Sequence, residues 1–192
     1  MDDDQVLIQD GQYKTVSCFS EFLPMESEQG YIRVVKPLTW ASSEPVRTPM
    51  VLLLPGTGEK RYGRRYDGVS LPLARMGVGS IVLICCGNQL QIMEGPFYGQ
   101  RKPKRQNGCK LLHVSDLPLL GAATIEEARS LLYYFFEAGY GPLVVGGISM
   151  GGLHAAMVAA LTPFPVGTAS LVGPPSAVPV FTSVVNQSSF HF

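Results

Sequence analysis

Residues 143–161 constrain the fold of this 192-residue chain more than any other stretch. The stretch begins with a short, valine-rich apolar run, as in a buried parallel strand, and ends in good helix formers. Between them, Gly-Ile-Ser-Met-Gly at positions 147–151 fits the Gly-x-Ser-x-Gly nucleophile elbow. Gly147 and Gly151 would permit the sharp turn, and Ser149 would present its hydroxyl as a nucleophile. Alternatively, Ser149 only caps the helix that follows.

Two backbone N–H groups are candidates for stabilising an oxyanion beside this serine. The first belongs to Met150, at the helix N-terminus, where positive partial charge gathers. The second belongs to Thr57, in the glycine loop after the apolar strand predicted at residues 50–54. Gly56 and Gly58 flank Thr57 and would leave room for a substrate. Taken alone, the loop could equally be an ordinary turn.

Strands and helical segments alternate from residue 50 to residue 172. This alternation is typical of the α/β class and predicts a doubly wound, mostly parallel sheet. The length suits one domain over residues 1–192. The predicted parts are an antiparallel edge at residues 12–48 with strands at 12–22 and 31–36, a parallel core at residues 49–182, and a polar tail at residues 183–192.

Charge and composition argue against several classes of protein. Lys+Arg and Asp+Glu balance at 15 each, so net charge indicates no surface for nucleic acid. The three histidines show no metal-ligand spacing, and we expect neither a metal nor a cofactor. Residues 146–151 match the Gly-x-Gly-x-x-Gly dinucleotide fingerprint poorly, which makes a dinucleotide-binding domain a weaker hypothesis.

The sequence also bears on the compartment. Gly, Pro, Ser and Thr interrupt every apolar stretch, so no transmembrane segment is expected, although peripheral membrane contact stays open. Four cysteines are too few for a disulfide scaffold and favour an intracellular, reducing compartment. The acidic N-terminus is typical of neither a secretory signal nor a transit peptide. The organelle is not indicated.

A basic loop at residues 95–105 carries four cations within five positions after a strand end. Arg101 and Lys102 could bind the phosphate or carboxylate of a substrate, or the charges could simply keep the loop solvated. A second cluster, Arg61, Arg64 and Arg65, is interpreted as a solvated loop face.

Six motifs, in order and at compatible spacing, resemble the alpha/beta-hydrolase domain-containing protein 18 family over roughly residues 20–182. They are Pro-Gly-Thr-Gly at 55–58, Gly-Pro-Phe-Tyr-Gly-Gln-Arg-Lys-Pro at 95–103, Val-Ser-Asp-Leu at 114–117, Gly-Tyr-Gly-Pro at 139–142, Gly-Ile-Ser-Met-Gly-Gly at 147–152 and Val-Phe-Thr at 180–182. The resemblance implies a serine-hydrolase fold, cleavage of acyl esters of lipids, and Ser149 as the nucleophile. Arg101 and Lys102 would then face an anionic lipid head group.

The partners of a catalytic serine are harder to find. In this architecture the acid and the histidine follow the serine along the chain, yet no Asp, Glu, Lys or Arg occurs after Glu137. His154 lies on the helix behind the serine, His191 in the polar tail, and His113 on an earlier segment, so none is favoured as the base. Because family members continue past the Val-Phe-Thr motif, we interpret the chain as C-terminally truncated, without the last strands and helices of the sheet.

Two functions therefore stay open. The first is a serine ester hydrolase whose acid and base are missing from this chain, which would impair it. The alternative is a catalytically inactive truncated isoform, or a binding module with the hydrolase fold. In both cases an exposed sheet edge would allow self-association.

Overall fold

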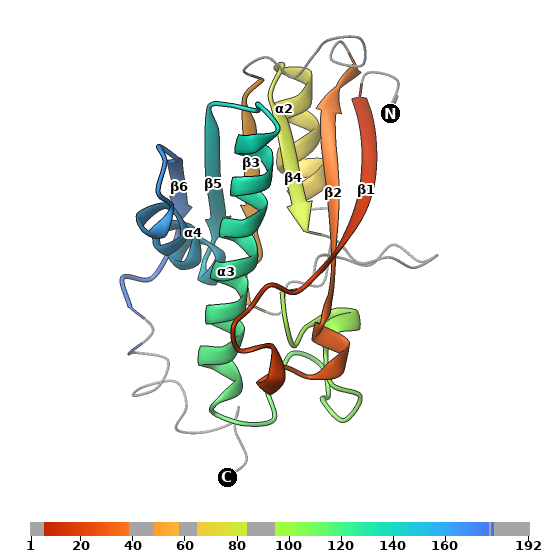
Figure 1. Cartoon of the computed structure of the whole chain (residues 1–192), viewed down its shortest axis with the longest axis vertical. Coiled ribbons are helices and arrows are strands. Elements are labelled where there is room, and N and C mark those ends of the chain that lie inside the picture. Colours follow the sequence, from red (N-terminus) through yellow and green to blue (C-terminus); the bar gives the residue numbers. More distant parts are fainter. Residues whose placement is uncertain (1–5, 39–47, 58–64, 84–94, 177, 179–192) are drawn as a thin grey trace.

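A mixed sheet organises the chain (Figure 1). The structure is a computed structural model and describes residues 6–38, 48–57, 65–83, 95–176 and 178. Within these ranges the sheet has six strands in the order β1-β2-β4-β3-β5-β6. The strands are β1 (Val6–Lys14), β2 (Gln29–Pro37), β3 (Met50–Leu54), β4 (Gly79–Leu83), β5 (Leu143–Ile148) and β6 (Gly167–Leu171).

The pairing confirms the predicted doubly wound, mostly parallel sheet. β4, β3, β5 and β6 run parallel to one another, whereas β1 and β2 form an antiparallel edge beside β4. β3 and β5 lie at the centre because their side chains are apolar at successive positions and can be buried on both faces.

The strand predicted at residues 12–22 has the wrong bounds, because β1 begins at Val6 and ends at Lys14. After Lys14 the chain leaves the sheet, and the Ser17 hydroxyl and Cys18 N–H donate to the Glu126 carboxylate. A short 3₁₀ turn, η1 (Ser20–Phe22), replaces the end of the predicted strand. Local side-chain bonds to a helix thus take the place of strand pairing.

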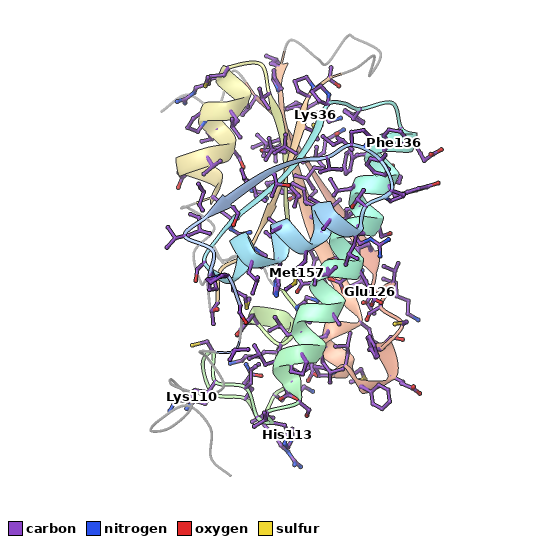
Figure 2. All side chains as sticks on the ribbon, turned by 90° about the vertical axis from the view of Figure 1, so that its left-hand side faces the viewer. Lys36, Lys110, His113, Glu126, Phe136 and Met157 are labelled. Carbon is purple, nitrogen blue, oxygen red and sulfur yellow. The ribbon has the colours of Figure 1, made fainter. Side chains whose placement is uncertain are left out.

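Helices cover both faces of the sheet. A π-helical turn, η4 (Tyr66–Ser70), leads into α2 (Leu71–Arg75), which contacts β1, β2 and β4 on one face. The helices α3 (Asp116–Glu137) and α4 (Met150–Leu161) pack against each other on the opposite face (Figures 1 and 2).

The core follows the two-residue period of the strands. Leu52, Leu54 and Val145 pack toward α3 and α4, whereas Leu53 faces the other way, toward η4. The main core is a cluster from the sheet, α3 and α4 that contains Val34, Met50, Leu52, Leu54, Ile81, Ala128, Leu131, Leu132, Phe135, Leu143, Val145, Ala155 and Val158.

The β5–β6 side of the sheet is less well covered. Every residue of β6 is exposed, and β6 pairs only with β5 in the described part of the chain. Ile148 and Leu171 are register partners, and they are 47% and 53% exposed. Such an open edge was expected from the sequence.

A layer of loops lies beyond the carboxyl ends of the parallel strands, in the lower part of Figure 1. It consists of residues 15–28, which include the turn η2 (Met25–Ser27), and residues 95–115, which include the turn η5 (Gly99–Arg101). The N-terminal half of α3 rises from this layer. Ligands of open α/β sheets bind at this end, so the loop layer borders the candidate site.

Some sequence expectations fall outside the described residues. They include the predicted polar tail and the Val-Phe-Thr motif. Cys18 and Cys109, the cysteines within the described ranges, are both exposed and form no disulfide. None of the described helices combines the length and apolar character that crossing a membrane requires.

Candidate active site

Ser149 lies at the corner where the chain leaves β5 and enters α4. Its backbone angles are φ 58° and ψ −122°, a conformation that residues other than glycine rarely adopt. The Ser149 N–H donates to the Leu171 carbonyl oxygen in β6 at 2.9 Å, which fixes the corner to the neighbouring strand. The serine side chain is exposed and makes no capping hydrogen bond to α4. The interpretation of Ser149 as a simple helix cap is therefore wrong.

Gly147 and Gly151 stand where no larger residue fits. A Cβ at Gly147 would lie 2.5 Å from the carbonyl carbon of Gly151, and one at Gly151 would lie 2.6 Å from the carbonyl oxygen of Pro55. The obstacles are backbone atoms, which cannot rotate away as a side chain can. The corner is therefore packed against the loop that follows β3.

That loop lies against the beginning of α4. Pro55 is buried, Gly56 is half-buried and Thr57 is exposed. The Thr57 hydroxyl approaches the Met150 sulfur at 3.5 Å, so the two residues predicted to supply the oxyanion donors are neighbours in space. The first N–H groups of a helix have no partner within it, which leaves that of Met150 available to a ligand. Gly58 lies outside the described residues.

The loop that begins at Gly95 lies next to the loop that follows β3. Gly95 lies beside Pro55, since a Cβ at Gly95 would be 3.6 Å from the Pro55 ring. Phe97 and Tyr98 follow, and both belong to a buried cluster that includes Met150. Residues 95–98 therefore lie beside Pro55, which precedes Thr57, and belong to the same buried cluster as Met150.

The expectation that Arg101 faces a substrate is wrong. Its side chain is 1% exposed and forms a bidentate ion pair with Glu127 of α3, at 2.9 Å and 2.6 Å. A third bond runs from Arg101 to the Ser27 carbonyl oxygen at 2.6 Å. A guanidinium held in this way inside the protein cannot reach an exposed head group. Lys102 is half-buried, and its predicted contact with substrate stays a prediction.

Glu127 is a structural residue that sequence reasoning missed. Besides Arg101, its carboxylate accepts hydrogen bonds from the Tyr13 hydroxyl at 2.8 Å and the Thr15 hydroxyl at 2.7 Å. Burial and the nearby Glu127 carboxylate raise the pKa of Tyr13 well above its ordinary value of 10.0. An available signal was the position of Glu127 beside Ala128 and Leu131 on the apolar face of α3.

Arg65 is also misplaced by the sequence interpretation, which assigned it to a solvated loop. It is 3% exposed, and its guanidinium donates to the carbonyl oxygen of Leu53 at 3.3 Å. Arg65 thus helps to fix the end of β3, immediately before the loop with Thr57. Arg61 and Arg64 lie outside the described residues.

The described histidines do not assemble a triad with Ser149. His154 is 6% exposed and directs its Nε2 toward Gly121 on α3, 3.4 Å from where a Cβ would stand. Burial lowers the pKa of His154 to about 4, so the ring is neutral near pH 7. His113 is exposed on the loop before α3, where its backbone N–H donates to Asp116. Within the described ranges, no three His, Cys, Asp or Glu side chains gather as a metal site would require.

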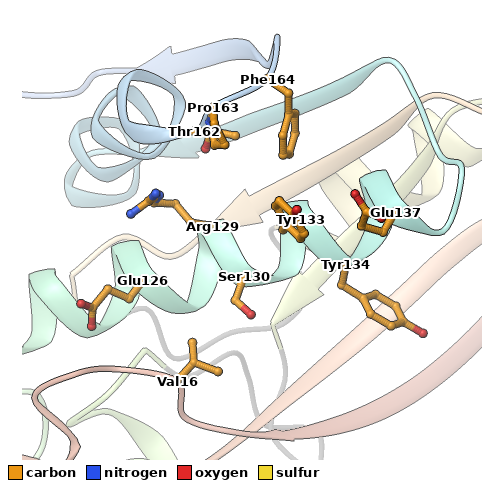
Figure 3. Close-up of a pocket in the computed structure, with 10 residues that line it drawn as sticks. All are labelled: Val16, Glu126, Arg129, Ser130, Tyr133, Tyr134, Glu137, Thr162, Pro163 and Phe164. Carbon is orange, nitrogen blue, oxygen red and sulfur yellow. The ribbon is translucent and has the colours of Figure 1, made fainter.

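A groove on the outer surface of α3 is separate from this site (Figure 3). Arg129, Tyr133 and Glu137 face the segment that follows α4, and Val16 closes the other side. The groove has a volume of about 620 Å³, but none of the predicted site residues lines it. The candidate active site therefore rests on the elbow and the two loops rather than on this groove.

Comparison with solved structures finds a similar architecture in three enzymes. A dienelactone hydrolase from Anabaena variabilis matches with a TM-score of 0.52 and 20% identity, over 90% of this chain and 68% of that chain. Carboxyl esterase 2 from the mycorrhizal fungus Tuber melanosporum matches with a TM-score of 0.51 and 16% identity, over 86% of this chain and 45% of that chain. A brefeldin A esterase, a bacterial homologue of human hormone-sensitive lipase, matches at 15% identity with a TM-score of 0.49, over 82% of this chain and 36% of that chain.

The first two likenesses show a shared fold. The chain spans about a third to two-thirds of the length of these enzymes, between 36% and 68%. A family model described as alpha/beta hydrolase domain containing 18 matches residues 1–192. The chain therefore belongs to the alpha/beta hydrolase domain containing 18 family.

Proposed function

We propose that this chain carries the nucleophile and the oxyanion donors of a serine ester hydrolase. The observation that carries the proposal is the backbone of Ser149, at φ 58° and ψ −122° between β5 and α4. A strained backbone at an exposed serine whose hydroxyl caps nothing points to a role for that hydroxyl outside the fold. In the proposed reaction, Ser149 Oγ attacks the acyl carbon, the alcohol leaves, and water then hydrolyses the acyl-serine.

The proposed oxyanion donors are the N–H groups of Met150 and Thr57. The N-terminus of α4 adds positive partial charge at the place where the acyl oxygen would become negative. The proximity of Thr57 to Met150, at 3.5 Å between their side chains, supports a shared role. The glycines of the Thr57 loop, Gly56 and Gly58, are proposed to leave room for the acyl group.

The proposed substrate is an acyl ester of a lipid. Two structural neighbours are described as a carboxyl esterase and a dienelactone hydrolase, which supports an ester or lactone carbonyl as the reacting group. The lipid class rests on the motifs shared with the family. Lys102, half-buried at the end of η5, is the proposed contact for an anionic head group.

The expected rate is low because the described residues do not complete a triad with Ser149. No Asp or Glu follows Ser149 in this sequence, and the buried His154 points toward α3. A serine hydroxyl without a positioned base is a weak nucleophile, and loss of triad members costs roughly 10⁴- to 10⁶-fold in kcat in serine proteases. We therefore expect this chain to acylate Ser149 slowly with activated esters rather than to turn over rapidly.

A burst assay with p-nitrophenyl acetate tests the proposal. The unaltered chain should release p-nitrophenol in a slow phase that saturates as Ser149 becomes acylated. Ser149→Ala should lose this phase, whereas Ser130→Ala, at an exposed serine of α3, should keep it. An equal phase in the Ser149→Ala protein would refute the assignment of the nucleophile.

The same absence of an acid favours one alternative, a binding module that keeps the hydrolase fold. Such a module would bind a non-hydrolysable lipid ester analogue without releasing nitrophenol from the activated ester. Calorimetric titration of the analogue beside the burst assay separates the two functions.

A further inference from the structure

The loop at residues 95–101 lies beside one segment of the candidate oxyanion site and shares a buried cluster with the other. At one end, Gly95 lies beside Pro55, two residues before Thr57. At the other, Phe97 and Tyr98 share a buried cluster with Met150 and Leu120. A shift of this loop would therefore move the surroundings of both proposed N–H donors.

Phe97 has a backbone conformation that is unfavourable for a residue with a bulky side chain. Its φ is 68°, which is uncommon for a residue with a bulky side chain, and the side chain is buried. The Phe97 N–H donates to the Ser27 hydroxyl at 3.1 Å, and the Phe97 carbonyl oxygen accepts from the Gln106 amide at 2.7 Å. Strain of this kind persists only where the surroundings enforce it, and it clusters at functional sites.

The contacts that hold the Phe97 backbone connect it to the buried ion pair between Arg101 and Glu127. The Ser27 hydroxyl that accepts from Phe97 donates in turn to the Arg101 carbonyl oxygen at 2.6 Å. The Arg101 side chain binds the Ser27 carbonyl oxygen and the Glu127 carboxylate. Glu127 is fixed on α3, and Tyr13 and Thr15 satisfy the remaining acceptor positions of its carboxylate. The chain of contacts thus runs from Glu127 through Arg101 and Ser27 to Phe97.

We propose that Arg101 and Glu127 are positioning residues for the reaction of Ser149, because their ion pair holds residues 95–101 against the two segments that carry the oxyanion donors. This inference rests on the proposed function. Neither residue touches the substrate, and their effect is transmitted through Ser27 and Phe97. Arg101, which the sequence suggested as a ligand contact, thus acts from inside the protein.

The expected consequence is a change in the rate of bond formation rather than in ground-state binding. Misplacing catalytic groups by about 1 Å can cost about 100-fold, and removing one oxyanion donor costs about 100- to 1,000-fold. Loosening the ion pair between Arg101 and Glu127 would displace the oxyanion donors without removing them, so we expect the rate of bond formation to fall about tenfold.

Fluorophosphonate labelling of Ser149 provides the measurement, because the phosphonyl oxygen of the reagent would occupy the oxyanion site. The dependence of the labelling rate on reagent concentration separates the maximal rate constant from the binding constant. Glu127→Gln removes the charge while keeping the shape. Ser27→Ala breaks the link between Arg101 and Phe97 while leaving the ion pair in place. Asp10→Asn is the matched control, because it breaks the exposed ion pair between Asp10 and Arg33 on β1 and β2.

In folded Glu127→Gln, we expect the maximal rate constant to fall about tenfold with an unchanged binding constant, and Asp10→Asn to match the unaltered chain. If Glu127→Gln does not fold, Ser27→Ala decides, with an expected loss of about threefold or more. Folded Glu127→Gln, or in its absence folded Ser27→Ala, with the maximal rate constant of the unaltered chain would overturn the positioning role alone. If Ser149 of the unaltered chain is not labelled at all, the proposed function and this inference both fail.

Discussion

At Gly151, the candidate site and the stability of the fold depend on the same atoms. A Cβ there would lie 2.6 Å from the Pro55 carbonyl oxygen and 2.7 Å from that of Leu54. Gly151→Ala must therefore push α4 away from the loop after β3. We expect the free energy of unfolding to fall by more than about 2 kcal/mol in urea titrations, as for other overpacked cores.

Gly68→Ala is the matched control for this prediction. A Cβ at Gly68 meets nothing within 4 Å, so this substitution should change the free energy of unfolding by less than about 1 kcal/mol. Equal stability of the Gly151→Ala and Gly68→Ala proteins would show that the elbow is not packed as described.

His154 makes a second prediction at the residue scale. Burial holds its pKa at about 4 in the folded protein, against 6.5 in the unfolded chain. Between these values the unfolded chain binds a proton that the folded chain excludes, so stability falls as pH falls from 6.5 toward 4. The loss between pH 7 and pH 5 should be about 2 kcal/mol.

His154→Gln isolates this contribution from the other titrating groups. The stability difference between the unaltered chain and His154→Gln should shift against the unaltered chain by about 2 kcal/mol from pH 7 to pH 5. Parallel stability curves for the two proteins would contradict the buried, neutral state of His154.

At the scale of elements, α3 ties the antiparallel edge to the loop layer. The Tyr13 hydroxyl of β1 donates to Glu127 on α3 at 2.8 Å. Tyr13→Phe should therefore lower the free energy of unfolding by about 1.5–3 kcal/mol, the range for hydrogen bonds to charged groups. Tyr31→Phe on the neighbouring strand is the control, since the Tyr31 hydroxyl has no hydrogen bond among the described residues. Comparable losses in both variants would argue against the network.

The edge strand β6 carries a prediction about association. Its residues are exposed, and no charged residue after Glu137 protects the edge from pairing with another strand. We expect the chain to self-associate with rising concentration in sedimentation experiments. Thr168→Lys, on β6, should keep it monomeric, whereas Ser130→Lys, on α3, should not. If the unaltered chain stays monomeric as its concentration rises, the prediction of self-association is wrong.

For the whole molecule, periodicity in the sequence predicted the sheet and its helices well. Apolar residues at successive positions indicated the strands β3 and β5, and the apolar face of α3 contributes Leu131, Leu132 and Phe135 to the core. These patterns are local and follow directly from burial. The elbow was equally visible, because a sharp corner requires glycine at fixed positions around Ser149.

Contacts between distant residues were not visible in the sequence. Arg101 was expected to face a ligand because it belongs to a run of cations, yet its partner Glu127 lies 26 positions away along the chain. The end of β1 was missed for a similar reason, since Ser17 and Cys18 bond to Glu126 on α3. No periodicity encodes such pairs, which depend on how α3 crosses the sheet.

The central claim is that the corner between β5 and α4 presents the Ser149 hydroxyl as a nucleophile. The most direct test is to treat the chain with a fluorophosphonate and to map the adduct by peptide mass spectrometry. We predict an adduct on Ser149 that is lost in Ser149→Ala and kept in Ser130→Ala. Modification at other sites with Ser149 left unmodified, in a chain shown to be folded, would contradict the claim.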